Sequence, residues 1–172
     1  LELPISPVAE EFLLISNAAT LGDIGYLGEI STSSIESSLM LNVISSSILI
    51  NRFLAQTSNK KRTLISISSG ASQNAYDGWG IYCSSKAAMD MLMDAIIKER
   101  EIRNDSFTRI YSFAPGVIDT EMQEKIRSSN PDQFSKLERF QELKQNGQLA
   151  SAVVVARQCI ELLVNANTFS SG

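Results

Sequence analysis

Three short runs with the composition of β-strands, separated by segments of helical length, constrain the fold of this 172-residue chain more than any other feature. The runs cover residues 12–16, 63–68 and 109–114. The first is almost continuously apolar, as expected of a strand that is covered on both faces. Helical patterns occupy 31–56 and 82–100 between the runs. Because strands that alternate with helices form parallel β/α units, the sequence predicts an α/β fold with a parallel sheet.

The ends of these elements carry ordinary boundary signals. A Ser/Thr cluster that begins at Ser31 suits a helix start, because hydroxyl side chains cap the first free N–H groups. A turn signal at 104–106 precedes the third strand, and the Pro-Gly pair at 115–116 ends it. A last helix is expected over 150–164. With 44% apolar residues the chain can form a substantial core, and its length predicts one domain over 1–172.

Composition argues against several classes of partner. The net charge is −4 and no basic stripe is present, which argues against nucleic acid and anionic membranes. The only basic cluster, at 60–62, is expected in a solvated turn. No uninterrupted apolar run reaches the roughly 18 residues that cross a bilayer, so no membrane span is expected. Cys83 and Cys159 have no metal or redox spacing, so no metal site is expected, and they suit free thiols in a reducing cytoplasm.

Tyr82 and Lys86 form the strongest chemical signal. Four residues apart on a predicted helix, their side chains share one face. An ammonium ion beside a phenol favours the phenolate, so we expect Lys86 to lower the pKa of Tyr82 toward neutrality. Such a tyrosine can act as general acid or base in a chain that contains no histidine.

Two further polar residues extend this signal. Ser69 lies thirteen positions before Tyr82, in the small-residue loop after the second strand. Its hydroxyl could hydrogen-bond the same substrate oxygen that Tyr82 protonates. Ser68 is the alternative, but side chains alternate along a strand, so only one of the two can face the site. Asn42 lies in the apolar part of the 31–56 helix, where a buried amide needs a partner.

Together these residues resemble the catalytic set of the short-chain dehydrogenase/reductase family. The segment 17–19 resembles the family's Asn-Asn-Ala-Gly motif, with Ala19 in place of the usual glycine, and 115–120 resembles its Pro-Gly-x-x-x-Thr loop. Further stretches resemble its sepiapterin reductase and benzil reductase branch: 78–79, 82–83, 86–92, 119–123, 141–149 and 169–172.

The resemblance implies a Rossmann-type, doubly wound parallel sheet in three α/β/α layers, with charged residues of 119–146 in a lid. It also implies hydride transfer from a nicotinamide cofactor to a small ketone or diketone. Tyr82 would be the general acid, Lys86 would bind the ribose, Ser69 would polarise the carbonyl, and Asn42 would bind a water in a proton relay.

Several binding residues follow from the same resemblance. The cofactor would contact Tyr82, Lys86 and the residues Asn17, Ala18, Ala19, Pro115, Gly116, Val117, Ile118, Thr120 and Met122. The substrate would contact Ser69, Gly70, Trp79 and Cys83, although Trp79 could equally be a core anchor and Cys83 a buried thiol. NADPH is the expected cofactor and NADH the alternative. The resemblance does not decide between a pterin and a diketone as the substrate. A homodimer through the helices at 31–56 and 82–100 is expected.

The family's glycine-rich cofactor fingerprint has no counterpart in this sequence. The chain begins just before the family's fourth strand and ends where its last strand would begin. We therefore expect a domain that is incomplete at both ends. The alternative is that the chain is a catalytically silent relative of this family that acts as a binding or regulatory protein. The intact set of Asn42, Ser69, Tyr82 and Lys86 favours the enzyme.

Overall fold

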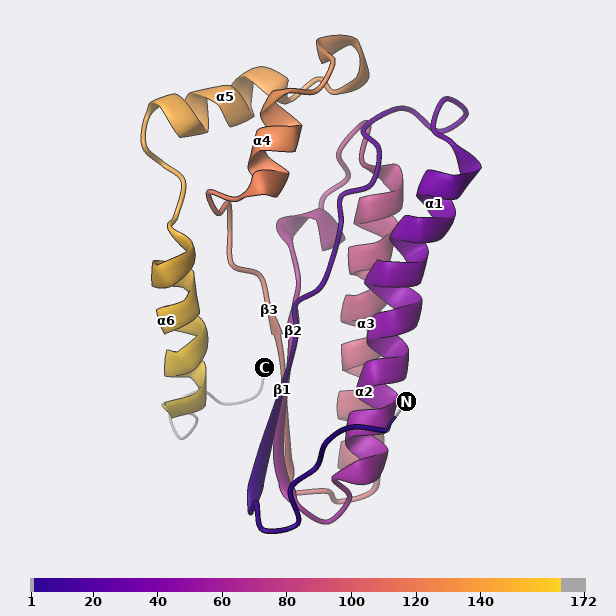
Figure 1. Ribbon diagram of the computed structural model, residues 1–172, viewed down its shortest axis with the longest axis vertical. Helices are drawn as coiled ribbons and strands as arrows, with labels where there is room; N and C mark the ends of the chain where they lie inside the picture. The colour runs from indigo at the N-terminus through magenta and orange to yellow at the C-terminus, as the bar shows by residue number, and fades with distance from the viewer. Residues whose placement is uncertain (1, 165–172) are drawn as a thin grey trace. The chain divides into compact units, whose positions relative to one another are not determined.

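The computed structural model describes residues 2–164 in two compact units (Figure 1). The first unit ends at Ala114, and the second begins at Pro115. The first unit holds the sheet and the helices between Thr32 and Ile102, and the described part of the second holds the helices between Glu121 and Val164.

The sheet of the first unit has three parallel strands in the order β1-β2-β3. The strands are β1 (Glu11–Ser16), β2 (Lys61–Ile67) and β3 (Thr108–Phe113). In register, Leu14 lies beside Leu64, and Leu64 lies beside Ile110. All three strands lie within two residues of the predicted ranges. The parallel sheet with flanking helices confirms the predicted α/β fold class.

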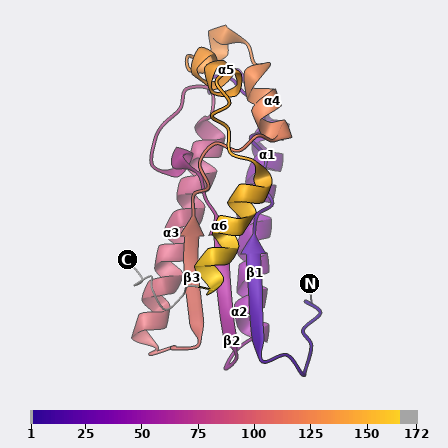
Figure 2. The ribbon, with the colours of Figure 1, turned by 90° about the vertical axis from the view of Figure 1, so that its left-hand side faces the viewer.

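Two helical segments lie side by side on one face of this sheet (Figures 1 and 2). The first comprises α1 (Thr32–Leu39), the π-helix η1 (Met40–Ser45) and α2 (Ser46–Gln56); the second is α3 (Gly80–Ile102). Ser31 caps α1 as expected, its Oγ accepting a hydrogen bond from Ser34 N at 3.2 Å. The sequence predicted one uniform helix over 31–56, so the π-helical turn in its middle is a difference.

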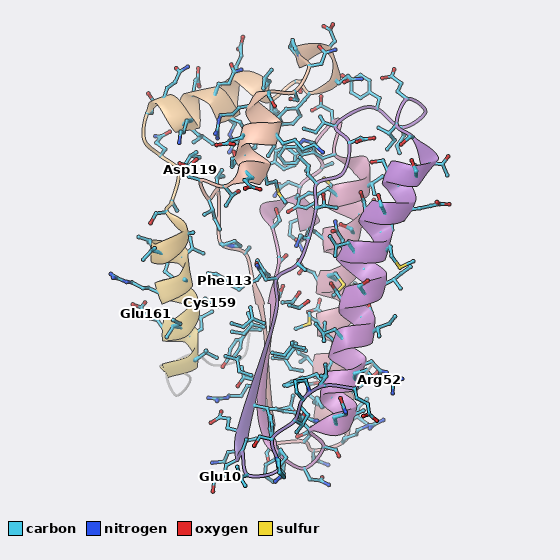
Figure 3. All side chains as sticks on the ribbon, viewed as in Figure 1. Glu10, Arg52, Phe113, Asp119, Cys159 and Glu161 are labelled. Atoms are coloured by element: carbon cyan, nitrogen blue, oxygen red, sulfur yellow. The ribbon has the colours of Figure 1, made fainter. Side chains whose placement is uncertain are left out.

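The core lies between these helices and the sheet. Its buried members are Ile50, Phe53, Leu64, Met89, Met93 and Ile96. Partly buried Phe12, Leu14 and Ile110 pack against it, so even-numbered strand residues face the helices. Arg52 lies on the outer, exposed side of α2 (Figure 3).

The segment Thr32–Gln56 is long and apolar enough to cross a membrane, by length and composition alone. The expectation that the chain has no membrane span stays a prediction. Serines interrupt its apolar runs, yet its mean hydropathy reaches 1.4 over 18 residues. Core helices of globular domains pass the same test, and Ile50 and Phe53 of this segment are buried in the core.

Arg62 joins the ends of three elements. It is 3% exposed, so the expectation of a solvated turn at 60–62 is wrong for this residue. Its guanidinium donates to Leu54 O at 2.5 Å, to Thr108 Oγ1 at 2.6 Å and to Asp105 Oδ2 at 3.1 Å. Arg100 also donates to Asp105, at 3.0 Å. These contacts between segments distant in the sequence satisfy the buried charge.

Asp105 is held ionised by this network. Partial burial alone raises its pKa, but hydrogen bonds from Thr108, the Phe107 amide, Arg62 and Arg100 outweigh that effect. The result is a pKa of about 2, below the ordinary 3.8.

The second unit contains α4 (Glu121–Arg127), a 3-10 turn (Pro131–Gln133), α5 (Leu137–Gln145) and α6 (Ala152–Val164). Its first turn contains Gly116 with φ of +77°, a conformation that favours glycine. Asp119 accepts from Lys144 at 2.5 Å and ties the start of α4 to the end of α5 (Figure 3). The exposed Glu161 and the buried Cys159 occupy different sides of α6 (Figure 3). The predicted final helix is confirmed.

Replacing Asp105 by Asn should destabilise the chain by about 2 kcal/mol at pH 7. A carboxylate whose pKa is depressed on folding stabilises the fold above its unfolded pKa, and this contribution is lost as pH falls from about 4 to about 2. The difference in free energy of unfolding between parent and variant, measured by urea denaturation, should therefore become smaller over that pH range. The exposed Asp94→Asn serves as control. A difference that stays constant down to pH 2 would contradict this account.

Candidate active site

Tyr82 and Lys86 lie in the first two turns of α3, beside the carboxyl end of β2. Each is only 7% exposed. Lys86 Nζ donates a 2.7 Å hydrogen bond to Ile67 O, the last residue of β2, and lies 5.7 Å from the centroid of the Tyr82 ring. The spacing of the two residues in the sequence therefore places a phenol and an ammonium ion together in a buried position.

Ser69 and Ser68 have different partners. Ser69 lies at the start of the 3-10 turn η2 (Gly70–Ser72), where its Oγ accepts from Ala71 N at 3.2 Å. Its side chain is hydrogen-bonded to Tyr82. Ser68 instead donates to Asp90 Oδ2 at 2.8 Å. The two neighbouring serines thus have different partners, and Ser69, in the loop after β2, is the one beside the phenol.

The electrostatics of Tyr82 differ from the expectation. Burial raises the pKa of Tyr82 above its ordinary value, the hydrogen bond with Ser69 lowers it in part, and Cys83 raises it further. Lys86, whose ammonium donates to the Ile67 carbonyl, does not bring the pKa of Tyr82 below its ordinary value. Burial also lowers the pKa of Lys86, against which the charge of Asp90 acts. Desolvation is therefore the largest influence on the pKa of both groups.

Asn42 lies in the π-helix η1 and is 3% exposed. Its Oδ1 accepts from Thr20 N at 2.8 Å, and its Nδ2 donates to Thr20 O at 2.8 Å and to Ser85 Oγ at 3.0 Å. Ser85 donates in turn to Tyr82 O at 2.8 Å. The amide thus clamps the loop after β1 to the helix that carries Tyr82. Sequence reasoning missed Thr20 and Ser85; the only signal was that a buried amide needs partners.

One aromatic side chain contacts the Tyr82 ring, and a second stacks on that neighbour. Trp79 immediately precedes α3, stacks on Tyr76 at a centroid distance of 4.8 Å, and meets Tyr82 edge to face at 6.2 Å. Sequence reasoning had not assigned Tyr76 a role. Cys83 is half-buried, with Sγ 3.8 Å from Asn74 O. Gly70 is exposed at the start of the 3-10 turn.

The segment expected to receive the cofactor ribose or adenine follows β1. Asn17 and Ala18 are exposed and Ala19 is half-buried. A pocket of about 180 Å³ adjoins this segment, lined by Ile15, Ser16, Asn17, Ala18, Leu41, Ser45, Ser46 and Leu49. Tyr82, Ser69 and Lys86 do not line it, so this pocket is not where a carbonyl would meet the phenol.

The other residues expected to contact the cofactor belong to the second unit: Pro115, Gly116, Val117, Ile118, Thr120 and Met122. Thr120 lies at the N-cap position of α4. The contacts expected of these residues stay predictions. The motif stretch at 169–172 lies outside the described residues. Among residues 2–164, no cluster of three or more His, Cys, Asp or Glu side chains could hold a metal ion.

Comparisons with known proteins place this chain in a family. The sequence profile described as short chain dehydrogenase matches residues 12–131. Benzil reductase ((S)-benzoin forming) of Bacillus subtilis is 39% identical over 87% of this chain and 62% of its own length. Sepiapterin reductase of Mus musculus is 36% identical over 99% of this chain and 65% of its own length. The chain therefore spans less than two thirds of the length of these relatives.

A solved structure agrees with the sequence matches. The crystal structure of the KRED1-Pglu enzyme superposes with a TM-score of 0.79 at 29% identity, over 87% of this chain and 61% of that one.

Replacing Asn42 by Ala should destabilise the protein by about 1–3 kcal/mol, because the Thr20 amide and carbonyl then lose their buried partner. Thermal unfolding measures the loss, and amide hydrogen exchange at Thr20 should become faster than in the parent. Asn51→Ala, an exposed change on α2, is the control. Unchanged exchange at Thr20 would show that Asn42 does not clamp the loop.

Proposed function

Because the chain belongs to the short-chain dehydrogenase family, whose members are oxidoreductases that bind nicotinamide cofactors, we propose that it reduces a small ketone or diketone. One observation carries the proposal: Ser69, Tyr82 and Lys86 converge at the carboxyl end of β2. Ligands bind at that edge in open α/β sheets.

Tyr82 is the general acid in this proposal. Burial raises its pKa, so the phenol stays protonated at neutral pH and can donate its proton to the forming alkoxide. The hydrogen bond with Ser69 brings the two hydroxyls to one place, where both can reach a single carbonyl oxygen. The ammonium of Lys86 then stabilises the phenolate that remains.

The donor groups fit a nicotinamide ribose. An ammonium has three N–H donors, and Ile67 O accepts one of those of Lys86. Lys86 and Tyr82 would hold the ribose, and Asn17, Ala18 and Ala19 offer a small-residue surface at the end of β1. The cofactor, when bound, supplies the hydride. NADPH is the proposed form, on the resemblance to the sepiapterin and benzil reductase branch, with NADH as the alternative.

The substrate proposed is an aromatic carbonyl compound, either a diketone or a pterin ketone. The named activities of the relatives support this class. The aromatic group of Tyr76, Trp79 and Tyr82 supports it as well, because ring faces and edges attract other aromatic rings. Gly70, which follows Ser69, and Cys83, which follows Tyr82, would complete the substrate contacts.

A cytoplasmic homodimer is part of the proposal. Apolar side chains are exposed along the helical segments, at Met40, Leu41, Ile44, Ile48 and Met91. Pairing of these segments between two copies would cover them. The free thiols of Cys83 and Cys159 suit a reducing compartment.

Replacing Tyr82 by Phe should lower kcat for benzil reduction by about 10²–10⁴-fold, because the proton donor is lost. Cofactor affinity, measured by fluorescence titration with NADPH and NADH, should change little, because Lys86 would still hold the ribose. Tyr111→Phe removes a phenol from β3 and should leave both quantities unchanged. Comparable turnover by the Tyr82→Phe protein would remove Tyr82 from this role, and cofactor binding without any reduction by the parent would favour the silent relative.

A further inference from the structure

Hydrogen bonds from serines on two neighbouring strand ends hold the carboxylate of Asp90, on α3, next to the candidate site. Asp90 is half-buried, one helical turn beyond Lys86 and two beyond Tyr82. Its Oδ2 accepts from Ser68 Oγ at 2.8 Å, and its Oδ1 accepts from Ser112 Oγ at 2.6 Å. Each oxygen therefore has its own donor, one from the end of β2 and one from β3.

The strand ends that supply these donors are themselves joined. Ser66 pairs with Ser112 in the sheet, and Ser68 N donates to Phe113 O at 2.8 Å. The carboxylate is thus hydrogen-bonded to a rigid edge and not to a mobile loop. Its negative charge has a fixed position relative to Lys86.

Lys86 needs such a charge. It is 7% exposed, and burial disfavours the ammonium form. The carboxylate of Asp90 acts in the opposite direction and favours the ammonium. The two serines hold Asp90 in place, while Lys86 donates to Ile67 O and lies next to the Tyr82 ring.

Other ionisable groups on the elements packed against α3 do not supply a charge that favours the ammonium form of Lys86. They are Glu36 on α1, Lys61 and Arg62 on β2, and Arg109 and Tyr111 on β3. Glu36 and Lys61 are exposed, and Arg62 is paired with Asp105 at the opposite end of β2. Arg109, which pairs with Glu11, and Tyr111 alternate with Ile110 and so face the other side of the sheet. The segments η1 and η2 contain no titratable residue.

We propose that Asp90 is a positioning residue for carbonyl reduction: held by Ser68 and Ser112, it keeps Lys86 protonated inside the buried site. Its catalytic meaning rests on the proposed function, because it acts on the reaction only through Lys86. Its electrostatic effect on Lys86 does not depend on turnover and is measurable separately.

The decisive measurement is the titration of Lys86 Nζ by NMR in protein labelled with ¹⁵N-lysine, with the resonance assigned by Lys86→Met. Asp90→Asn keeps the shape of the side chain and removes its charge. It should move the Lys86 titration midpoint down by about one pH unit, since a carboxylate one helical turn away favours the ammonium form. Asp94→Asn, the same change one turn farther along α3 at an exposed position, should leave the midpoint in place.

Asp90→Glu separates charge from shape. It keeps the charge and alters the hydrogen-bond geometry, so it should preserve the midpoint better than Asp90→Asn does. A purely structural role predicts the reverse, with Asn tolerated and Glu disruptive. If Asp90→Asn does not fold, as judged by circular dichroism, Asp90→Ser makes the same charge change with a hydroxyl, and the same comparison applies.

Turnover adds a second readout. The alkaline limb of the pH profile for benzil reduction should move down with the Lys86 midpoint in Asp90→Asn and stay in place in Asp94→Asn. An unchanged Lys86 midpoint in the charge-removing variant would overturn the assignment of Asp90. A shifted midpoint in a protein that reduces no carbonyl would instead overturn the proposed function and leave the electrostatic assignment standing.

Discussion

The burial of a phenol and an ammonium ion side by side is the constraint on which the rest of this structure depends. Tyr82 and Lys86 are each almost inaccessible to water, and burial moves the pKa of each toward its neutral form. Their polar neighbours compensate: Ser69 hydrogen-bonds the phenol, Ile67 O accepts from the ammonium, and Asp90 supplies a charge. The site is therefore a balance of desolvation against a few fixed dipoles and one carboxylate.

The parallel fold supplies that balance. A β/α/β crossover brings the start of α3 to the carboxyl end of β2, where strand carbonyls and loop hydroxyls are available. The preceding crossover adds Asn42, which fastens the loop after β1 to α3 through Thr20 and Ser85. Asn42 lies within the π-helical turn Met40–Ser45, and such turns often occur at functional positions.

Local sequence patterns predicted much of this arrangement, because strand runs, helix spacing and the Tyr82–Lys86 interval depend on near neighbours. They failed where distant residues decide the outcome. Arg62 was expected in solvent because its partner Asp105 is 43 positions away. The direction of the Tyr82 pKa was wrong because spacing on a helix does not report burial. The π-helical turn was missed because the serine-rich segment from Ser31 carries no break in its pattern.

The register of β2 against β3 connects stability to the site. At one end, Arg62 pairs with Thr108 and donates a hydrogen bond to its hydroxyl. Four residues later in β2, Ser66 pairs with Ser112. Both ends of the face toward α3 are thus fixed by polar contacts, with Asp105 at one and Asp90 at the other. A slip of one residue would exchange the directions of Ser68 and Ser69. The phenol would then lose its hydroxyl partner and Asp90 one of its donors. The buried ion pair far from Tyr82 therefore helps to determine which serine the phenol meets.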